Sequence, residues 1–278
     1  MSATVVHSVI DRTPEPVTHA AICTALAAAG VSSGASVIVH SSLSRIGWVV
    51  GGAHTVVGAV LDAVGPDGTV TMPSMSSDLS DPARWEAPPV PESWWQTIRE
   101  QTPAFDVHLT PTTHMGAVVE CFRHVPGAVR SAHPADSFVS VGPLAPHVAQ
   151  PHPLSPAFGD GSPLSRLYEL DARIVLLGVG HSNNTSLHLA EWRAAQASMP
   201  ATIITYGAPV MRDGARQWVE FEDLDYDADD FAALGDAFAA DGGEVQIVPL
   251  GVGDVTTCSM REIVDFGVSW LCANRPQR

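Results

Sequence analysis

The strongest constraint on the fold is an alternation of short apolar β-type runs with helical segments, joined by glycine-rich turns. Residues 36–40 (SVIVH) have the pattern of a buried strand, and residues 53–64 have a helical apolar period. The turn Gly65-Pro66-Asp67-Gly68 then leads to a second β-type run at 69–72. This order of strand, helix and strand predicts a βαβ crossover, and therefore a sheet that contains parallel strand pairs.

Further elements continue the alternation. Residues 17–29 are helical in pattern, residues 174–178 (IVLLG) form another buried strand, and a helix over about 184–198 follows. The sequence Ser259-Met260-Arg261-Glu262 is a capping box that opens a final helix to about residue 273. With 45% apolar residues the chain can bury a full core.

We predict one domain over residues 16–278, preceded by a possible loose tail at 1–15. Two irregular, proline-rich regions interrupt the domain, at about 78–111 and 143–163. Loops of this length inside a compact domain are usually functional, so we expect insertions that line a binding site.

Charge narrows the possible chemistry. All 14 basic residues are arginines and there is no lysine, which excludes Schiff-base and P-loop chemistry. The formal charge of −16 argues against nucleic-acid binding and favours a cationic partner.

The histidines show no metal-ligand spacing, so we expect no metal site. Residues 1–16 have no signal-peptide pattern and the apolar run 20–29 is too short to span a bilayer, which predicts a soluble, cytoplasmic protein.

Two glycine-containing turns that follow predicted strands are candidates for chemistry. The first, residues 39–52, leads from His40 through Ser41 and Ser42 to a helix, and small residues there make either a cofactor cradle or an ordinary loop. The second, residues 178–191, leads into a helix that carries His188, with Glu191 one turn further on the same face. His188 is either a general base or a buried structural histidine.

A third candidate is the acidic run at residues 220–230, with seven carboxylates in eleven residues. Such a run is usually a solvated face, although one carboxylate could orient a catalytic imidazole. Asp106 either lies in a cleft or caps a turn. Arg130 and Ser131 either contact a phosphate-bearing cofactor or anchor a loop.

Several of these segments, taken in order, resemble the aminoglycoside 3-N-acetyltransferase (antibiotic N-acetyltransferase) family. The resemblance covers about residues 17–271. Its motifs are VHSSLSRIGWVVGG (39–52), GPDGTVTMPS (65–74), FD (105–106), MGAVVECFRHVPGAVRSAHPADSFVSVG (115–142), SPLSRL (162–167), LLGVGHSNNTSLHLAE (176–191) and FEDLDYDADDF (221–231). The resemblance implies an α/β/α layered fold with a mixed central sheet, unlike Gcn5-type acetyltransferases, and acetyl-CoA as the acyl donor.

The resemblance also implies roles for individual residues. His188 and Glu222 match a dyad in which the carboxylate supports a histidine that deprotonates the 3-amino group of the acceptor. Asp106, Glu191 and Asp223 match positions that hold ammonium groups of a cationic aminoglycoside, with Asp223 as the alternative support for His188. The residues that match the cofactor site are His40, Ser41, Ser42, Leu43, Gly51 and Gly52, with Arg130 and Ser131 as weaker candidates.

The acceptor region at 78–110 matches no subclass. The sequence therefore leaves three alternatives to an antibiotic-resistance acetyltransferase. The chain could acetylate a different amine, could bind cationic ligands without acylating them, or could be a hydrolase that uses Ser41 or Ser42 with His188. The last alternative lacks the G-x-S-x-G turn of such hydrolases.

Overall fold

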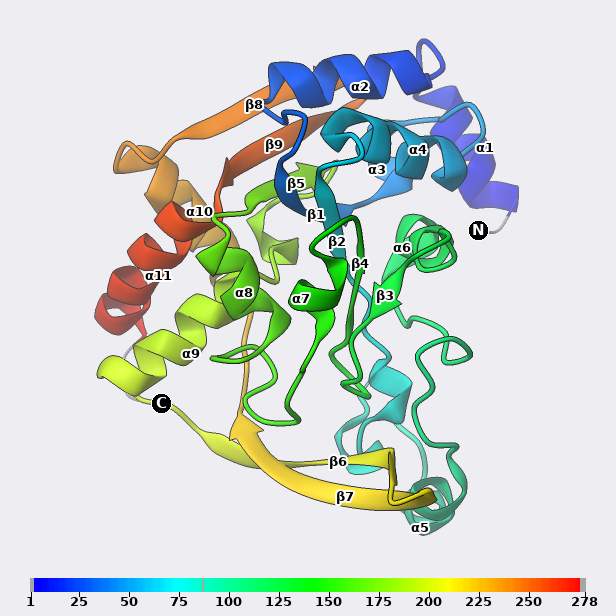
Figure 1. Ribbon diagram of the computed structural model, residues 1–278, viewed down its shortest axis with the longest axis vertical. Helices are drawn as coiled ribbons and strands as arrows, with labels where there is room; N and C mark the ends of the chain where they lie inside the picture. The colour runs from blue at the N-terminus through cyan, green and yellow to red at the C-terminus, as the bar shows by residue number, and fades with distance from the viewer. Residues whose placement is uncertain (1–2, 87, 276–278) are drawn as a thin grey trace.

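The computed structural model describes residues 3–86 and 88–275. Within these residues, a mixed seven-stranded sheet with the order β3-β4-β2-β1-β5-β9-β8 forms the centre of the molecule (Figure 1). Its strands are β1 (Ser36–Ser41), β2 (Thr69–Pro73), β3 (Val129–Arg130), β4 (Phe138–Val141), β5 (Arg173–Leu177), β8 (Val245–Leu250) and β9 (Gly253–Ser259). A separate long hairpin is formed by β6 (Ile203–Arg212) and β7 (Ala215–Leu224).

The predicted βαβ crossover is confirmed. Helix α4 (Ala53–Val64) connects β1 to β2, and these two strands pair in parallel with Val37 opposite Val70. On its other side β1 pairs in parallel with β5, with Ile38 opposite Ile174. The outer pairs of the sheet are antiparallel. The carboxyl ends of β1, β2 and β5 therefore meet at one edge, where ligands bind in open α/β sheets.

Helices cover both faces of the sheet. One face packs against α2 (His19–Ala28), α4 and α6 (Gly116–Phe122), and the other against α8 (Pro163–Glu169), α9 (Leu187–Ala197) and α11 (Met260–Asn274), as Figure 1 shows. Strand β1 serves both layers, because Val37 and Val39 point to one core while Ile38 points to the other. This three-layer arrangement confirms the predicted α/β/α fold with a mixed sheet.

Local capping signals set the helix ends. The Ser259 hydroxyl accepts a hydrogen bond from the Glu262 N–H at 3.1 Å and starts α11 where the capping box predicted it. Helix α9 starts at Leu187, three residues later than predicted. Asn184 delays it, because this buried side chain caps a turn by accepting the Ser186 N–H at 3.2 Å.

The segment predicted as a loose tail contains helix α1 (Ala3–Asp11). Thr13, which follows it, anchors this region. Its hydroxyl donates to the Val9 carbonyl oxygen at 2.6 Å and accepts from the Trp48 N–H at 2.9 Å. Val9 is buried, so the segment packs on the domain.

The first proline-rich region, about residues 78–111, packs against the β6–β7 hairpin at one end of the molecule (Figure 1). The Arg216 Nε donates to the Thr102 carbonyl oxygen at 2.9 Å, and the Phe105 N–H donates to the Pro209 carbonyl oxygen at 3.1 Å. The remaining elements include η1 (Ser77–Leu79), η2 (Pro82–Arg84), α5 (Glu92–Gln101), η3 (His181–Asn183), α3 (Leu43–Ile46), α7 (Ala145–Ala149) and α10 (Phe231–Ala240).

In the described part of the chain, no helix combines the length and the apolar character needed to cross a membrane.

We expect Gly251→Ala to destabilise the β8–β9 turn by about 2 kcal/mol. Gly251 has a φ of +62°, and an added Cβ would collide with the Ile46 carbonyl oxygen at the end of the loop after β1. Gly214→Ala is the matched control, because Gly214 also has a positive φ of +75° but an added Cβ would meet open space. Urea unfolding compares the two variants, and equal losses would show that backbone strain alone is responsible.

Candidate active site

Two sets of cavities lie near the carboxyl edge of β1, β2 and β5. The first cavity, of about 340 Å³, lies between the loop after β1 and the start of α6, and its lining includes Ser41, Ser42, Leu43, Arg45, Met115, Val179 and Asn183. A smaller cavity of about 90 Å³ shares Ser41 and Val179 with it and adds His40, Pro73 and Thr185. Together we call these two cavities the cofactor-side pocket.

A further cavity, of about 310 Å³, lies between the segment after β2, the helix α9 and the β6–β7 hairpin. We call it the acceptor-side pocket. Its lining includes His188, Asp136, Asp223, Tyr206, Phe221 and Tyr226. Pro73 lines one pocket and Met75 the other, so the end of β2 separates two neighbouring binding spaces.

His40 lies at the inner end of the cofactor-side pocket and is buried. Its Nε2 accepts the Thr185 N–H at 3.0 Å, so the proton of the neutral ring is on Nδ1. Burial lowers the pKa of His40 to about 3, with smaller contributions from the charges of His181 and His188. His40 is therefore neutral at physiological pH, and its Nδ1–H has no partner among the described residues.

Ser41, Ser42 and Leu43 line the cofactor-side pocket, as the resemblance implied for the cofactor loop. The Ser41 hydroxyl is buried and has no hydrogen-bond partner in the described part of the chain. A free hydroxyl and the free imidazole N–H of His40 in one cavity fit a ligand that carries carbonyl and amide groups, such as the acylated pantetheine arm of acetyl-CoA. The same free hydroxyl argues against a hydrolase, because no base activates Ser41.

Gly51 and Gly52 shape the backbone turn that precedes α4. Both have positive φ values, +76° and +62°, and they form the turn that starts α4. Neither glycine is among the residues that line the cofactor-side pocket.

Arg130 and Ser131 hold loops together. The guanidinium of Arg130 is buried and donates to the carbonyl oxygens of Ser74 and Thr110 and to the hydroxyls of Ser76 and Ser137. Ser131 is fully buried between the Phe138 N–H and the His152 ring. Arg130 thus ties the segment after β2 to the loop at Thr110, and Ser131 ties the residues after β3 to β4, which agrees with the loop-anchoring alternative that the sequence left open.

His188 comes from the first turn of α9 and lies in the acceptor-side pocket. Its Nδ1 lies 2.8 Å from Glu191 Oε2, and because an ionised carboxylate only accepts, Nδ1–H donates. The ring stacks on Phe158, with 4.9 Å between the ring centroids. These contacts fix the ring, and in its neutral form they favour the tautomer whose unprotonated nitrogen is Nε2. No hydrogen bond from a described residue occupies Nε2. An imidazole held in this way can act chemically as a general base.

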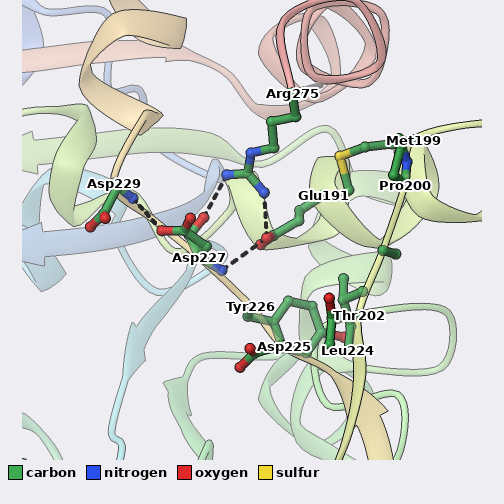
Figure 2. A pocket seen from close by; sticks show the side chains of 11 residues that line it. Glu191, Met199, Pro200, Thr202, Leu224, Asp225, Tyr226, Asp227, Asp229 and Arg275 are labelled. Atoms are coloured by element: carbon green, nitrogen blue, oxygen red, sulfur yellow. Dashed lines mark hydrogen bonds and ion pairs between the residues drawn. The ribbon is translucent and has the colours of Figure 1, made fainter. Parts of the chain in front are cut away.

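The carboxylate that forms a hydrogen bond with His188 is thus Glu191, three residues along the same helix. Glu191 is almost completely buried, and its other oxygen, Oε1, accepts from Arg275 and from the Asp227 N–H at 2.9 Å. Figure 2 shows these contacts in a separate cavity that Glu191 lines and His188 does not, and from here on we call His188 and Glu191 the dyad. The resemblance implied that Glu191 holds an ammonium group of the acceptor, but Glu191 does not line the acceptor-side pocket, and both of its oxygens accept hydrogen bonds from the protein.

Glu222, the residue that the resemblance placed beside His188, is exposed on β7 and makes no contact with that histidine. The reason is strand alternation, because Phe221 and Asp223 face the acceptor-side pocket and Glu222 points to the opposite side. Asp223 is buried and accepts the Ala157 N–H at 2.7 Å and the Leu224 N–H at 2.8 Å. Burial raises the pKa of Asp223, and these hydrogen bonds oppose the shift only in part.

Asp106 lies outside the acceptor-side pocket and caps a turn. Its carboxylate accepts the N–H groups of His108 and Leu109, each at 2.8 Å. The hydrogen bonds from Leu109 and His108 lower the pKa of this exposed carboxyl group. This position agrees with the turn-capping alternative.

Sequence reasoning missed two charged residues of this region. Asp136 lines the acceptor-side pocket, where burial raises its pKa, and it lies within the motif that ends at residue 142. The local sequence around Asp136 gave no signal of a site. Arg275 contacts Glu191 across 84 residues of sequence, and no local pattern predicts such a pair.

We expect Arg130→Met to lower the free energy of unfolding by about 3 kcal/mol, because it leaves two carbonyl oxygens and two hydroxyls without their donor. Urea unfolding measures this loss. Calorimetry with coenzyme A on the folded variant should give an affinity within about twofold of the parent. Normal stability with weakened coenzyme A binding would return Arg130 to the cofactor site.

Comparison with known proteins agrees with this architecture. The model of the family described as aminoglycoside 3-N-acetyltransferase matches residues 38–272. The SPbeta prophage-derived aminoglycoside N(3')-acetyltransferase-like protein YokD of Bacillus subtilis is 41% identical over 267 residues, which cover 96% of each chain. Aminoglycoside N(3)-acetyltransferase VII of Streptomyces paromomycinus is 34% identical, over 95% of this chain and 94% of that one.

Solved structures agree as well. The crystal structure of YokD superposes with a TM-score of 0.92, at 40% identity, over 96% of this chain and 98% of that chain. The binary complex of AAC-IIIb with CoASH superposes with a TM-score of 0.81, at 29% identity, over 95% and 99% of the two chains. With matches that extend over nearly the whole length, the chain belongs to the aminoglycoside 3-N-acetyltransferase family of acyltransferases.

Proposed function

We propose that the protein transfers the acetyl group of acetyl-CoA to the 3-amino group of 2-deoxystreptamine aminoglycosides, with His188 as the general base. The observation that carries the proposal is the His188–Glu191 pair. Its 2.8 Å hydrogen bond engages Nδ1 and leaves Nε2 for an acceptor, and the His188 ring lines a pocket that also holds two carboxylates.

His188 supplies the step that an amine acceptor needs. An ammonium group is not a nucleophile, so a base must remove a proton before or as the amine attacks an acyl carbon. Nε2 of His188 takes that proton, and the negative charge of Glu191 stabilises the imidazolium that forms. Acetyl-CoA supplies the thioester from which the acetyl group is transferred.

The acceptor-side pocket suits a polycationic sugar. Asp136 and Asp223 supply negative charge, and the rings of Tyr206, Phe221 and Tyr226 supply apolar faces for sugar rings. The pKa of each carboxyl group is raised by burial. An ammonium group within about 4–6 Å favours the charged carboxylate, so binding of a cationic acceptor relieves this cost.

Four residues of the cofactor-side pocket would hold the acyl-pantetheine end of acetyl-CoA: His40, Ser41, Ser42 and Leu43. The phosphates of acetyl-CoA require basic side chains as partners, and such side chains are scarce in a chain with a net charge of −16. Arg45 lines the cofactor-side pocket, and with Arg12 it also lines an adjoining open cavity of about 550 Å³ that includes Asp254. No carboxylate in the described residues forms an ion pair with Arg12 or Arg45.

We expect His188→Ala to lower kcat by about 10³-fold while the affinity for acetyl-CoA changes less than about twofold. Glu191→Gln should lower kcat by about 10²-fold, because it removes the charge that stabilises the imidazolium. Glu222→Gln is the matched control and should retain full activity. The assay records free-thiol release from acetyl-CoA with a panel of aminoglycosides and other amines, together with product mass.

The same assay separates the alternatives. Thiol release with a different amine would change the acceptor class, and tight antibiotic binding without thiol release would identify a sequestering protein. Acetate release without an acceptor amine would identify a hydrolase. Full activity of the His188 variant would overturn the assignment of the base.

We expect Arg45→Ala to weaken coenzyme A binding about tenfold but to leave the binding of acetyl-pantetheine unchanged, because only coenzyme A carries phosphates. Arg212→Ala is the matched control, since Arg212 is an exposed arginine at the far end of the β6–β7 hairpin. Isothermal titration measures both ligands at low and high salt. Equal losses for the two ligands would show that Arg45 shapes the pocket and does not bind phosphate.

A further inference from the structure

Arg275 follows the last helix, α11, and lies beyond the residues that the family model covers. Its guanidinium connects three parts of the chain that are distant in sequence. It donates to Glu191 Oε1 on α9 at 2.5 Å, to both oxygens of Asp230 before α10, and to the Asp227 carbonyl oxygen at 2.6 Å. Figure 2 shows Arg275 reaching from the end of α11 to Glu191 and Asp227.

The contact with Glu191 has a specific electrostatic consequence. Glu191 is only 1% exposed, and a buried carboxylate without a cation is costly to ionise. Arg275 and the Asp227 N–H share Oε1, which leaves Oε2 to accept from His188 Nδ1. Oε1 of Glu191 therefore contacts the Arg275 guanidinium, whereas Oε2 contacts the His188 imidazole.

We infer that Arg275 is a positioning residue for the acyl transfer: it holds Glu191 in place and limits how tightly the Glu191–His188 pair retains a proton. The inference rests on the proposed role of His188 as the base. A base must take up a proton in one step and release it afterwards, and a nearby cation opposes excessive proton affinity of the pair.

A purely structural role is the competing explanation, because Arg275 also pairs with Asp230 and with the Asp227 carbonyl oxygen. Burial disfavours the charge of Arg275, but its hydrogen bonds to Asp230 and Glu191 raise its pKa above the ordinary value. It is thus a permanent cation beside the dyad. A structural loss would lower activity equally at every pH, whereas loss of this charge changes the pH dependence.

The sign of that change follows from electrostatics. Removal of a cation strengthens proton binding by the dyad, so its proton is lost at higher pH. The other titratable groups near His188 are Asp136, Asp223, Tyr226 and His40, and all of them remain in the variant. Asp227, Asp229 and Asp230 lie on the Arg275 side, and without the guanidinium their charges act in the same direction.

A separate cavity behind the dyad makes a decisive test possible. It has a volume of about 410 Å³ and is lined by Glu191, Arg275, Asp227 and Asp229. Truncation of Arg275 to alanine would enlarge it beside Glu191. A small guanidinium compound can then enter from solvent and replace the missing group.

The experiment compares Arg275→Ala and Arg275→Lys with the parent and with Arg261→Ala. Arg261 lies at the opposite end of α11 and contacts the carbonyl oxygens of Tyr168 and Glu169, so it is the matched control. Circular dichroism verifies folding of each variant. The pH profile of kcat/KM and the KM for acetyl-CoA are then measured with and without methylguanidinium, which is also added to Glu191→Gln.

For Arg275→Ala we expect the acidic limb of the kcat/KM profile to move to higher pH by about one unit, which is about a tenfold loss at low pH. The KM for acetyl-CoA should stay within about twofold. Methylguanidinium should restore the profile of Arg275→Ala but not the activity of Glu191→Gln. Arg275→Lys should retain the position of the profile because it retains the charge, and Arg261→Ala should behave as the parent.

A folded Arg275→Ala variant with the parent profile would overturn the inference. A uniform loss at all pH values without rescue would also overturn it and would assign Arg275 a structural role. A second readout needs no substrate: nitrogen NMR of the His188 ring should show protonation at higher pH in Arg275→Ala. This titration distinguishes failure of the inference from failure of the proposed function, which the thiol-release assay on the parent protein tests.

Discussion

The arrangement of this site depends on one buried charge, the carboxylate of Glu191. A buried ion is tolerated only where hydrogen bonds and a counter-charge compensate for lost hydration. Here α9 supplies the carboxylate and His188, the loop before α10 supplies a backbone N–H, and the residue after α11 supplies the guanidinium. The partners of this one carboxylate therefore come from three segments that are distant in sequence, and the packing of α11 against α9 brings Arg275 to it.

The parallel centre of the sheet places the two binding spaces side by side. Strands β1, β2 and β5 end at one edge, so the segments after them carry Ser42, Met75 and Val179 to the same region. The two spaces then differ in chemistry. The cofactor side has a free hydroxyl and a neutral imidazole, whereas the acceptor side has carboxylates among aromatic rings. This division suits a neutral acyl arm on one side and a cationic amine on the other.

Polar residues that resemble ligand contacts in the sequence often have structural roles. Arg130 donates to carbonyl oxygens and hydroxyls of the surrounding loops, Ser131 contacts the Phe138 N–H and the His152 ring, and Asp106 caps a turn. Long loops contain many backbone groups that no sheet or helix satisfies, and buried side chains must pair with them. A polar residue in such a loop is therefore as easily an anchor as a binding group, and its sequence alone does not distinguish the two.

What the sequence by itself determined is local. The βαβ crossover follows from apolar periodicity, and the start of α11 follows from its capping box. The separation of one helical turn places His188 and Glu191 on one face of α9, but the resemblance assigned the support of His188 to Glu222, and only the structure shows the hydrogen bond to Glu191. The tertiary structure decided which distant charges meet. Glu222 and Asp223 are neighbours in sequence, but strand alternation sends only Asp223 into the acceptor-side pocket. Arg275 reaches Glu191 only because α11 packs against α9, and that packing is set by the apolar core between the helices and not by either charged residue.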